Sequence, residues 1–171
     1  MTTVAFDGKT IACDSQVSSE SGDSSYKELS TKSKIIDTVA GPALVIAVGL
    51  ISDYEEALGL IAQGKNPKLT EAESELLLVK DGQVYNLQPS SSPKAGQPLK
   101  RVPARAYPVN SRAAWGSGNV FAYTVLRLGG TAAQAVAAGV EIDLYSGGTV
   151  HAWDVATMSK LKVAQKTPAI K

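Results

Sequence analysis

The segment MTTVAFDGKTIACDSQVS, residues 1–18, decides the fold. Polar and apolar residues alternate over 3–7 (TVAFD) and again over 10–17 (TIACDSQV), and the letters DGK separate the two runs. Alternation with a period of two is typical of a strand with one buried face, and Asp-Gly between two such runs predicts a hairpin. A hairpin therefore begins directly after Met1, with the hydroxyl residue Thr2 at its start.

Further strands follow this hairpin before the first helix. The apolar runs KSKIIDTV (32–39) and PALVIAVG (42–49) predict a second strand pair. The apolar spacing then becomes helical over 51–64, where Ser52 and Glu55 form a capping-box pattern at the start. The first helix is therefore expected to follow four strands.

The second part of the chain mixes a hairpin, two helices and a last strand. Asp81-Gly82 predicts the turn of a hairpin, and the five prolines and serine cluster of 89–110 predict a surface insertion loop. Helices are expected over 119–128 and 132–145, followed by a strand over 147–155.

The order of these elements predicts the fold class. Strands and helices do not alternate regularly, which favours antiparallel sheets with helices on their outer faces over a doubly wound parallel sheet. The sequence contains no internal repeat and no linker-like stretch between two domains. We therefore predict one α+β domain over residues 1–171.

Composition limits the classes of function. The chain is 44% hydrophobic and 19% charged, with a formal net charge of +1, so nothing electrostatic favours nucleic acid or an anionic membrane as a partner. One cysteine, Cys13, excludes an internal disulfide and fits a reducing compartment. No apolar run is long enough to span a membrane, and the N-terminus lacks the features of a signal peptide. We expect a cytoplasmic protein.

The sequence also excludes several kinds of catalytic site. The only histidine, His151, argues against a histidine-based metal site and against a Ser-His-Asp system. Glycine-rich phosphate and dinucleotide motifs are missing as well, so we expect no cofactor. An enzyme of this sequence needs a base other than histidine.

Thr2 offers such a base once Met1 has been removed. An N-terminal threonine carries both a hydroxyl and a free α-amine, whose ordinary pKa of about 7.7–8.0 lets it accept the hydroxyl proton near neutral pH. Taken alone, the letters MTT favour a plain strand start. Other residues must therefore decide between the two interpretations.

Several short motifs together resemble one family. The stretches TTVAFDGKTIACDSQVS, SKII, AVGLISD, WGSGNVFAY and DLYSGG occur in the order found in the proteasome β-subunit family. DSQVS and the spacing from Lys34 to Gly49 are most similar to the bacterial threonine protease HslV, or to a compact proteasome-like subunit of a bacterium or phage. The resemblance covers roughly 2–64, 75–88 and 113–155. It implies an N-terminal-nucleophile hydrolase with a four-layer αββα sandwich.

The resemblance also implies a role for each candidate residue of a threonine endopeptidase. Thr2 is implied as nucleophile and base, Lys34 as the charge that tunes it, and Asp14 as the residue that orients Lys34. Gly49 is implied as the oxyanion donor. The hydroxyls and carboxylate around the Thr2 amine are implied to come from Ser117, Asp143 and Ser146. The implied substrate-binding residues are Val17 and Ser18 on the peptide-binding strand, Ala47 at the base of a pocket, and Ile51 beside it.

One departure concerns the region after Gly49. The family has two helices before the next hairpin, whereas only one fits here, because 65–73 is too short for a second. In HslV the corresponding region lies near the face that meets a ring ATPase. The sequence therefore leaves open both the docking of an unfoldase and the size of a ring.

The resemblance implies a self-compartmentalised particle that hydrolyses peptides or unfolded proteins. We expect a homo-oligomer of stacked rings with six- or sevenfold symmetry, or an open helical assembly. Ala135 and Ala138 share a helix face and are expected at the contact between layers. A catalytically silent ring or scaffold subunit, and a small-molecule amidase of the same fold, remain as alternatives.

Overall fold

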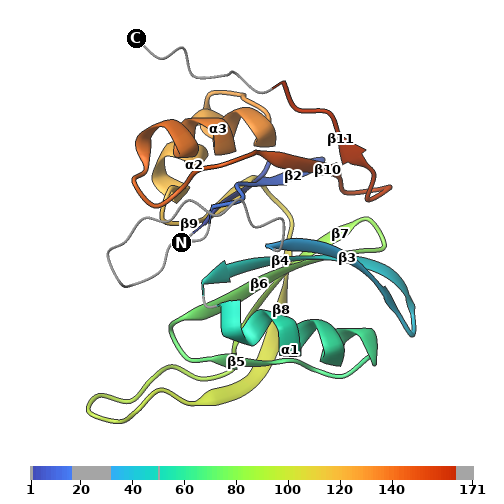
Figure 1. Cartoon of the computed structure of the whole chain (residues 1–171), viewed down its shortest axis with the longest axis vertical. Coiled ribbons are helices and arrows are strands. Elements are labelled where there is room, and N and C mark those ends of the chain that lie inside the picture. Colours follow the sequence, from blue (N-terminus) through green and yellow to red (C-terminus); the bar gives the residue numbers. More distant parts are fainter. Residues whose placement is uncertain (1, 17–31, 50, 165–171) are drawn as a thin grey trace.

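The computed structural model describes residues 2–16, 32–49 and 51–164. Two antiparallel sheets lie face to face, and helices cover the outer side of each, which gives four layers in the order α, β, β, α (Figure 1). The predicted fold class is confirmed.

The first sheet has five strands and carries the start of the chain. Its order is β11-β10-β2-β1-β9, with every neighbouring pair antiparallel, so β1 lies between β2 and β9. Its strands are β1 (Thr3–Phe6), β2 (Thr10–Cys13), β9 (Ala113–Gly116), β10 (His151–Asp154) and β11 (Lys160–Leu161).

The predicted hairpin at the start of the chain is confirmed. Phe6 pairs with Ile11 across the turn. Asp7 Oδ1 accepts hydrogen bonds from the backbone N–H groups of Lys9 (3.0 Å) and Thr10 (2.7 Å). Gly8 has a φ of +101°, a backbone conformation that glycine adopts readily because it has no Cβ. The turn chemistry of DGK therefore fixes where β1 ends and β2 begins.

The second sheet has six strands in the order β3-β4-β6-β7-β8-β5. It contains both hairpins that were predicted around the first helix. Its strands are β3 (Ser33–Thr38), β4 (Gly41–Gly49), β5 (Lys68–Thr70), β6 (Ser74–Lys80), β7 (Gln83–Pro89) and β8 (Arg101–Val109).

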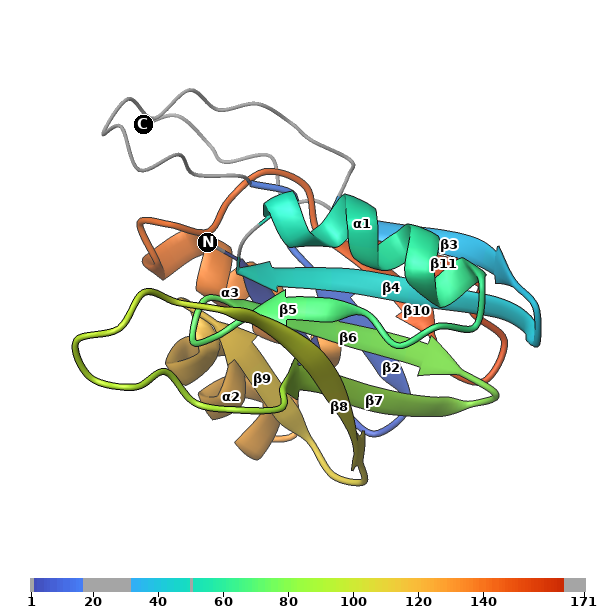
Figure 2. The same cartoon turned by 90° about the horizontal axis from the view of Figure 1, so that it is seen from below.

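The prediction of a loop over 89–110 is wrong for Arg101–Val109, which form β8. Proline has no backbone N–H to donate to a neighbouring strand. Strand β8 nonetheless accommodates Pro108 because of where this residue lies in the sheet. β5 pairs only with Arg101, Val102 and Pro103, so within the described residues Pro108 has a partner strand on one side only, where a missing N–H costs little. The connection before β8 projects from one end of the molecule (Figure 2).

Three helices form the outer layers. Helix α1 (Ile51–Ala62) covers the six-stranded sheet, and α2 (Asn119–Arg127) and α3 (Ala132–Ile142) cover the five-stranded sheet (Figure 1). Between β4 and β6 the described chain contains α1 and the short strand β5, so the expected loss of a second helix is confirmed. Helices α2 and α3 end slightly earlier than the sequence predicts, at Arg127 and Ile142.

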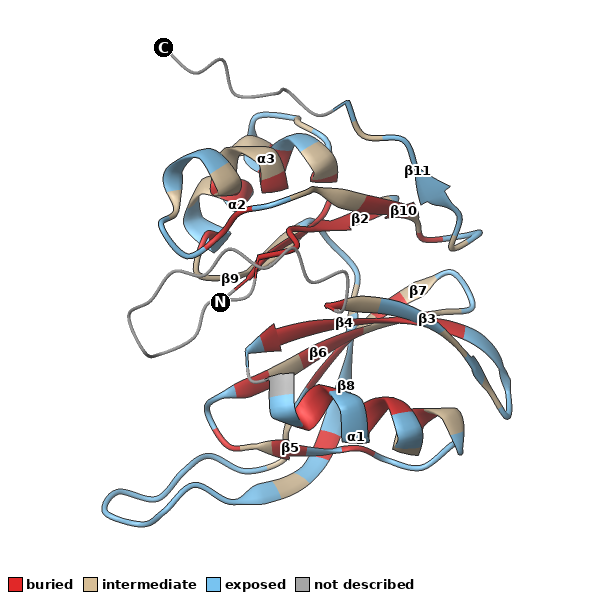
Figure 3. Ribbon diagram, in the orientation of Figure 1, coloured by how far each residue is buried: buried red, intermediate tan, exposed pale blue. Residues whose placement is uncertain are grey.

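The buried side chains form three clusters that match the layers (Figure 3). One lies between the sheets, one under α1, and one under α2 and α3. The last cluster consists mostly of alanine, which lets the two helices lie close to β1 and β2. Its buried members are Ala5, Ala12, Ala122, Leu126, Ala132, Ala135, Val136 and Ala152.

The placement of Ala135 on the outer face of α3 is wrong. Ala135 is 0% exposed and belongs to the cluster that faces the five-stranded sheet, and Ala138 is half-buried. The periodicity of an alanine-rich helix does not distinguish its two faces, because small residues suit both. The large apolar side chains exposed on and beside α2 and α3 are instead Val120, Tyr123, Leu128, Ile142, Leu144 and Tyr145.

We expect Ala135→Asp to unfold the subunit rather than to separate two layers. A carboxylate at this position has no partner in an apolar cluster, and we expect a loss of about 3 kcal/mol in the free energy of unfolding. Urea denaturation followed by tryptophan fluorescence measures it. Ala95→Asp, the same change on an exposed loop, should stay within about 0.5 kcal/mol of the parent. Equal stability of the two variants would contradict the orientation of α3.

Candidate active site

Thr2 lies immediately before β1 and is buried. Its carbonyl oxygen accepts a hydrogen bond from the Ser117 N–H at 3.0 Å, and Thr3 pairs with Gly116. A Cβ at Gly116 would come within 1.6 Å of the Thr2 carbonyl oxygen, and its φ is +86°. The end of β9 therefore packs directly on the backbone of Thr2, which only glycine at 116 allows.

A buried ion pair lies next to this start of the chain. Asp14 directly follows β2 and is 0% exposed, and Lys32 is 3% exposed. Asp14 Oδ1 accepts hydrogen bonds from the Thr3 N–H (3.0 Å) and from Lys32 Nζ (3.2 Å). Asp14 Oδ2 accepts from the Gly147 N–H at 3.0 Å. One carboxylate thus joins Thr3, Lys32 and Gly147.

Burial has the largest effect on the ionisation of this pair. It raises the pKa of the Asp14 carboxyl and lowers the pKa of the Lys32 ammonium, because both charged forms lose solvation. Each charge opposes the shift of the other, and the N–H groups of Thr3 and Gly147 also favour the Asp14 carboxylate. The pair therefore lies next to Thr3 without contact with bulk water, and each partner favours the charged form of the other.

The assignment of Lys34 as the lysine beside Asp14 is wrong. Lys34 pairs with Val45, whose side chain belongs to the cluster under α1. Paired residues of neighbouring strands project to the same face, so Lys34 points away from the five-stranded sheet and is exposed. Lys32 precedes β3, although its carbonyl oxygen still accepts a hydrogen bond from the Ala47 N–H at 2.7 Å. The sequence contains both lysines, and only the buried ion pair with Asp14 distinguishes them.

Ser117, Asp143 and Ser146 are brought together, as the sequence predicts. Asp143 Oδ2 accepts hydrogen bonds from Ser117 Oγ (2.5 Å) and Ser146 Oγ (2.6 Å). Burial acts to raise the pKa of the Asp143 carboxyl, but these hydroxyl bonds outweigh it, and the pKa lies below its usual value. Asp143 is therefore an ionised acceptor at neutral pH.

Thr3 links this hydroxyl network to the start of the chain. Thr3 Oγ1 lies 2.5 Å from Ser146 Oγ. Because the single hydroxyl proton of Ser146 goes to Asp143, Thr3 is the donor in this bond. Thr3 was not among the candidate residues predicted from the sequence, although the Thr-Thr pair contains it. Its side chain is enclosed by Gly118 and Gly139, where an added Cβ would lie 2.1 and 3.0 Å from Thr3 Oγ1.

Gly49 ends β4 at the same end of the sandwich as the start of β1 (Figure 1 and Figure 2). Its φ is +101°, and a Cβ there would lie 2.0 Å from the Glu73 carbonyl oxygen, so both conformation and space require glycine. A cavity of about 450 Å³ is lined by both Gly49 and Gly116. The cavity therefore opens beside the backbone of Thr2.

The remaining candidate residues are placed only in part. Ala47 is buried in the cluster under α1, and Ile51 begins α1. Val17 and Ser18, expected on the peptide-binding strand, lie outside the described residues, as does the side chain of Ile51.

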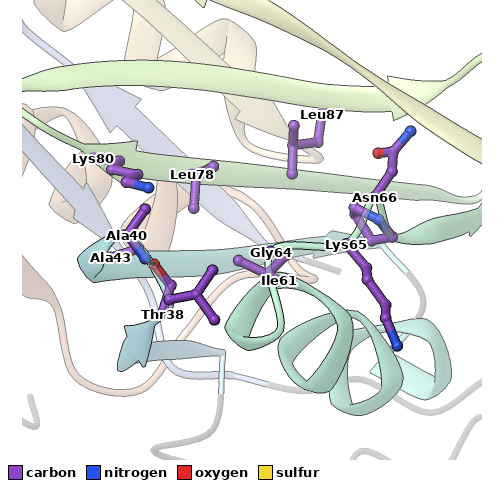
Figure 4. A pocket seen from close by; sticks show the side chains of 12 residues that line it. Thr38, Ala40, Ala43, Ile61, Gly64, Lys65, Asn66, Leu78, Lys80 and Leu87 are labelled. Atoms are coloured by element: carbon purple, nitrogen blue, oxygen red, sulfur yellow. Dashed lines mark hydrogen bonds between the residues drawn. The ribbon is translucent and has the colours of Figure 1, made fainter.

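A second cavity, of about 310 Å³, lies on the opposite side of the six-stranded sheet. It is enclosed by the end of α1 and by side chains such as Ile61, Leu78 and Leu87, with Lys65 and Lys80 also in its lining (Figure 4). Its lining shares no residue with the network around Thr2. It lies where only one helix covers the sheet.

Other chemistries find little support in the described part of the chain. No group of three or more metal-ligating side chains comes together there. Burial raises the pKa of Cys13 to about 12, so this thiol stays protonated and is a poor nucleophile. Among the described helices, none has the length and apolarity needed to cross a membrane.

Comparisons with known proteins identify the fold. No family model and no curated protein matches the sequence. Two solved structures of BPH from Thiobacillus denitrificans are similar, each at 16% identity over 90% of this chain. The structure in complex with epoxomicin has a TM-score of 0.58 and is covered over 98% of its length, and the other has 0.55 and 97%. The chain thus has a proteasome-like fold.

We expect Lys32→Ala to destabilise the protein far more than Lys34→Ala. Removal of Lys32 leaves the Asp14 carboxylate buried without its counter-charge, which costs about 3–5 kcal/mol in comparable pairs. Lys34 is exposed, and its loss should change the free energy of unfolding by no more than about 0.5 kcal/mol. Urea denaturation of both variants provides the comparison. A larger effect at Lys34 would contradict the register of β3.

Proposed function

We propose that this protein is a threonine peptidase whose nucleophile is Thr2 after removal of Met1. The observation that carries the proposal is that Thr3, the residue bonded to Thr2, joins two polar systems. Thr3 N–H reaches the buried Asp14–Lys32 pair, and Thr3 Oγ1 reaches the hydroxyl network of Asp143. The similarity of the chain to the BPH structure that was solved in complex with epoxomicin supports the same site.

The first step of the proposed reaction uses both functional groups of Thr2. The neutral α-amine accepts the proton of Thr2 Oγ1, directly or through a water, while this oxygen attacks the carbonyl carbon of the scissile bond. The proton then passes to the leaving nitrogen as the carbon–nitrogen bond breaks. This leaves an ester on Thr2, which a water molecule hydrolyses to release the acid and restore the hydroxyl.

The proposed electrostatic role passes from Lys34 to Lys32. A positive charge near Thr2 lowers the pKa of both its hydroxyl and its amine, and Asp14 holds that charge in place. Ser117, Asp143 and Ser146 accept and donate hydrogen bonds around the new amine. Gly49 N–H is proposed to stabilise the oxyanion, for which its place beside the cavity next to Thr2 is suitable.

The first test addresses Thr2 directly. A peptide epoxyketone reacts with an N-terminal threonine through both the hydroxyl and the amine, so protein shown by intact mass to begin at Thr2 should gain one inhibitor there. Peptide mapping locates the adduct. Thr2→Ala should abolish both labelling and peptide hydrolysis, a loss of at least about a hundredfold. A processed chain that is neither labelled nor active would support the silent-subunit alternative instead.

We further propose that the chain assembles into two stacked layers in the cytoplasm, with Thr2 facing an internal chamber. The exposed apolar side chains on and directly after α2 support this, since Val120 is 68% and Leu128 84% exposed. Isolated apolar side chains are ordinary on protein surfaces, but a group on one helix layer favours contact with another protein. A peptide or unfolded protein is the proposed substrate, and an ATPase partner is left open.

Light scattering tests this assembly. We expect particles many times larger than the 17.8 kDa subunit, and Val120→Asp should reduce the mass by separating the layers. Val39→Asp places the same charge at an exposed position on the other side of the molecule and should leave the mass unchanged. A stable monomer would refute the chamber and leave the amidase alternative ahead.

A further inference from the structure

The lining of the cavity beside Thr2 is acidic. Its described lining includes Glu73 and Glu75 and contains no lysine, arginine or histidine. Gly49 and Gly116 form the wall nearest Thr2, and Gln88 and Ser91 lie on the wall formed by β7 and the following chain. A group that binds here therefore meets carboxylates without competing cations in the lining.

Glu75 is held in a fixed position. Its Oε1 accepts hydrogen bonds from Asn86 Nδ2 at 2.6 Å and from Gln88 Nε2 at 3.0 Å. Both bonds go to one oxygen, so Oε2 is left to accept from a bound group. A carboxylate oriented in this way by two amides loses little side-chain freedom when a ligand binds.

Asn86 is the more buried of the two amides that hold Glu75. Asn86 is only 9% exposed, and within the described chain its Oδ1 has no hydrogen-bond donor. A buried amide oxygen without a partner is uncommon, because the lost hydration is not replaced. Asn86 is not part of the cavity lining, so it acts by holding Glu75 through its amide N–H rather than by contacting the ligand.

The cavity lies across β4 from the pocket implied for the residue before the scissile bond. Ala47, implied at the base of that pocket, faces α1. Val48, the next residue on β4, lines the cavity and belongs to the cluster between the two sheets. Successive residues of a strand project to opposite faces, so the two spaces lie on opposite sides of β4. The cavity is thus suited to the other side of the scissile bond.

We propose that this cavity binds the lysine or arginine side chain of the residue that follows the scissile bond. The inference rests on the proposed peptidase function and adds a substrate preference to it. Glu75 is the principal partner of the cation, and Glu73 adds negative charge at the exposed part of the lining. The preference acts on the leaving part of the peptide, before the ester on Thr2 forms.

The test uses pairs of internally quenched peptides that differ only in the residue after the scissile bond. One peptide of each pair has lysine there, and the other has norleucine, which is similar in length but uncharged. We expect kcat/KM to be about fivefold higher for lysine, since partly exposed ion pairs are modest in strength. The ratio should fall towards one in 0.5 M salt and in Glu75→Gln.

Glu55→Gln is the matched control. It removes the same charge from the exposed surface of α1, outside the cavity, and should keep the lysine preference of the parent. A parent enzyme without a lysine preference, or a preference that survives in Glu75→Gln, would overturn the inference.

A third substrate separates this inference from the proposed function. A peptidyl aminocoumarin has no amino acid after the scissile bond, so its hydrolysis reports on Thr2 but not on the cavity. Hydrolysis of the aminocoumarin without any lysine preference would refute only the subsite. Failure to hydrolyse all three substrates, on a chain that begins at Thr2, would refute the peptidase and the subsite with it.

Discussion

The buried carboxylate of Asp14 is the interaction on which the arrangement around Thr2 depends. It follows β2 of one sheet, bonds to Lys32 at the entrance to the other sheet, and accepts N–H groups from Thr3 and Gly147. Burying a carboxylate costs free energy unless an opposite charge and hydrogen bonds compensate for its lost hydration, and here three donors do so. Because the carboxylate and its three donors come from four separate parts of the fold, the free-energy cost of losing any of these bonds fixes the relative positions of these parts.

Small residues complete this arrangement by letting backbones approach the first residues of the chain. Gly116 contacts the Thr2 carbonyl, and Gly118 and Gly139 enclose the Thr3 side chain. The close approach of α2 and α3 brings Ser117 and Asp143 near each other, since Ser117 lies just before the start of α2 and Asp143 just after the end of α3. Alanine under the helices serves the same purpose for β1 and β2.

Local patterns predicted most of the fold. The short strands β5, β9 and β11 were not predicted. The hairpin around Asp7-Gly8, the strand pairs β3–β4 and β6–β7 and the single helix before β6 were all accessible, because turn chemistry and periodicity are local properties. Strand β8 was not accessible from the sequence. Its prolines argue against a strand, and they are tolerated only because part of β8 lies at an unpaired edge of the sheet. The inward face of Ala135 was also inaccessible, because short side chains give α3 no clear apolar side.

The candidate site could be predicted where the motif order was sufficient and not where it depended on register. Ser117, Asp143 and Ser146 meet as expected, because each is fixed by a helix end or the turn after it. Lys32 and Lys34 lie two residues apart at the start of the same apolar run, and only the three-dimensional contacts show which one reaches Asp14. Lys32 forms the buried ion pair, whereas Lys34 lies inside β3 and is exposed. Roles assigned by resemblance transfer safely only as far as the strand register is known.

The site network does not require the amine that the proposed chemistry needs. Its bonds are made by the side chains of Asp14, Lys32, Ser117, Asp143 and Ser146, by Thr3, and by the backbones of Thr2 and Gly147. None of them uses the Thr2 α-nitrogen or its hydroxyl. On the proposed mechanism, removal of Met1 frees the Thr2 amine next to a network that is already assembled by bonds among other groups, so that these groups need little reorganisation for the reaction.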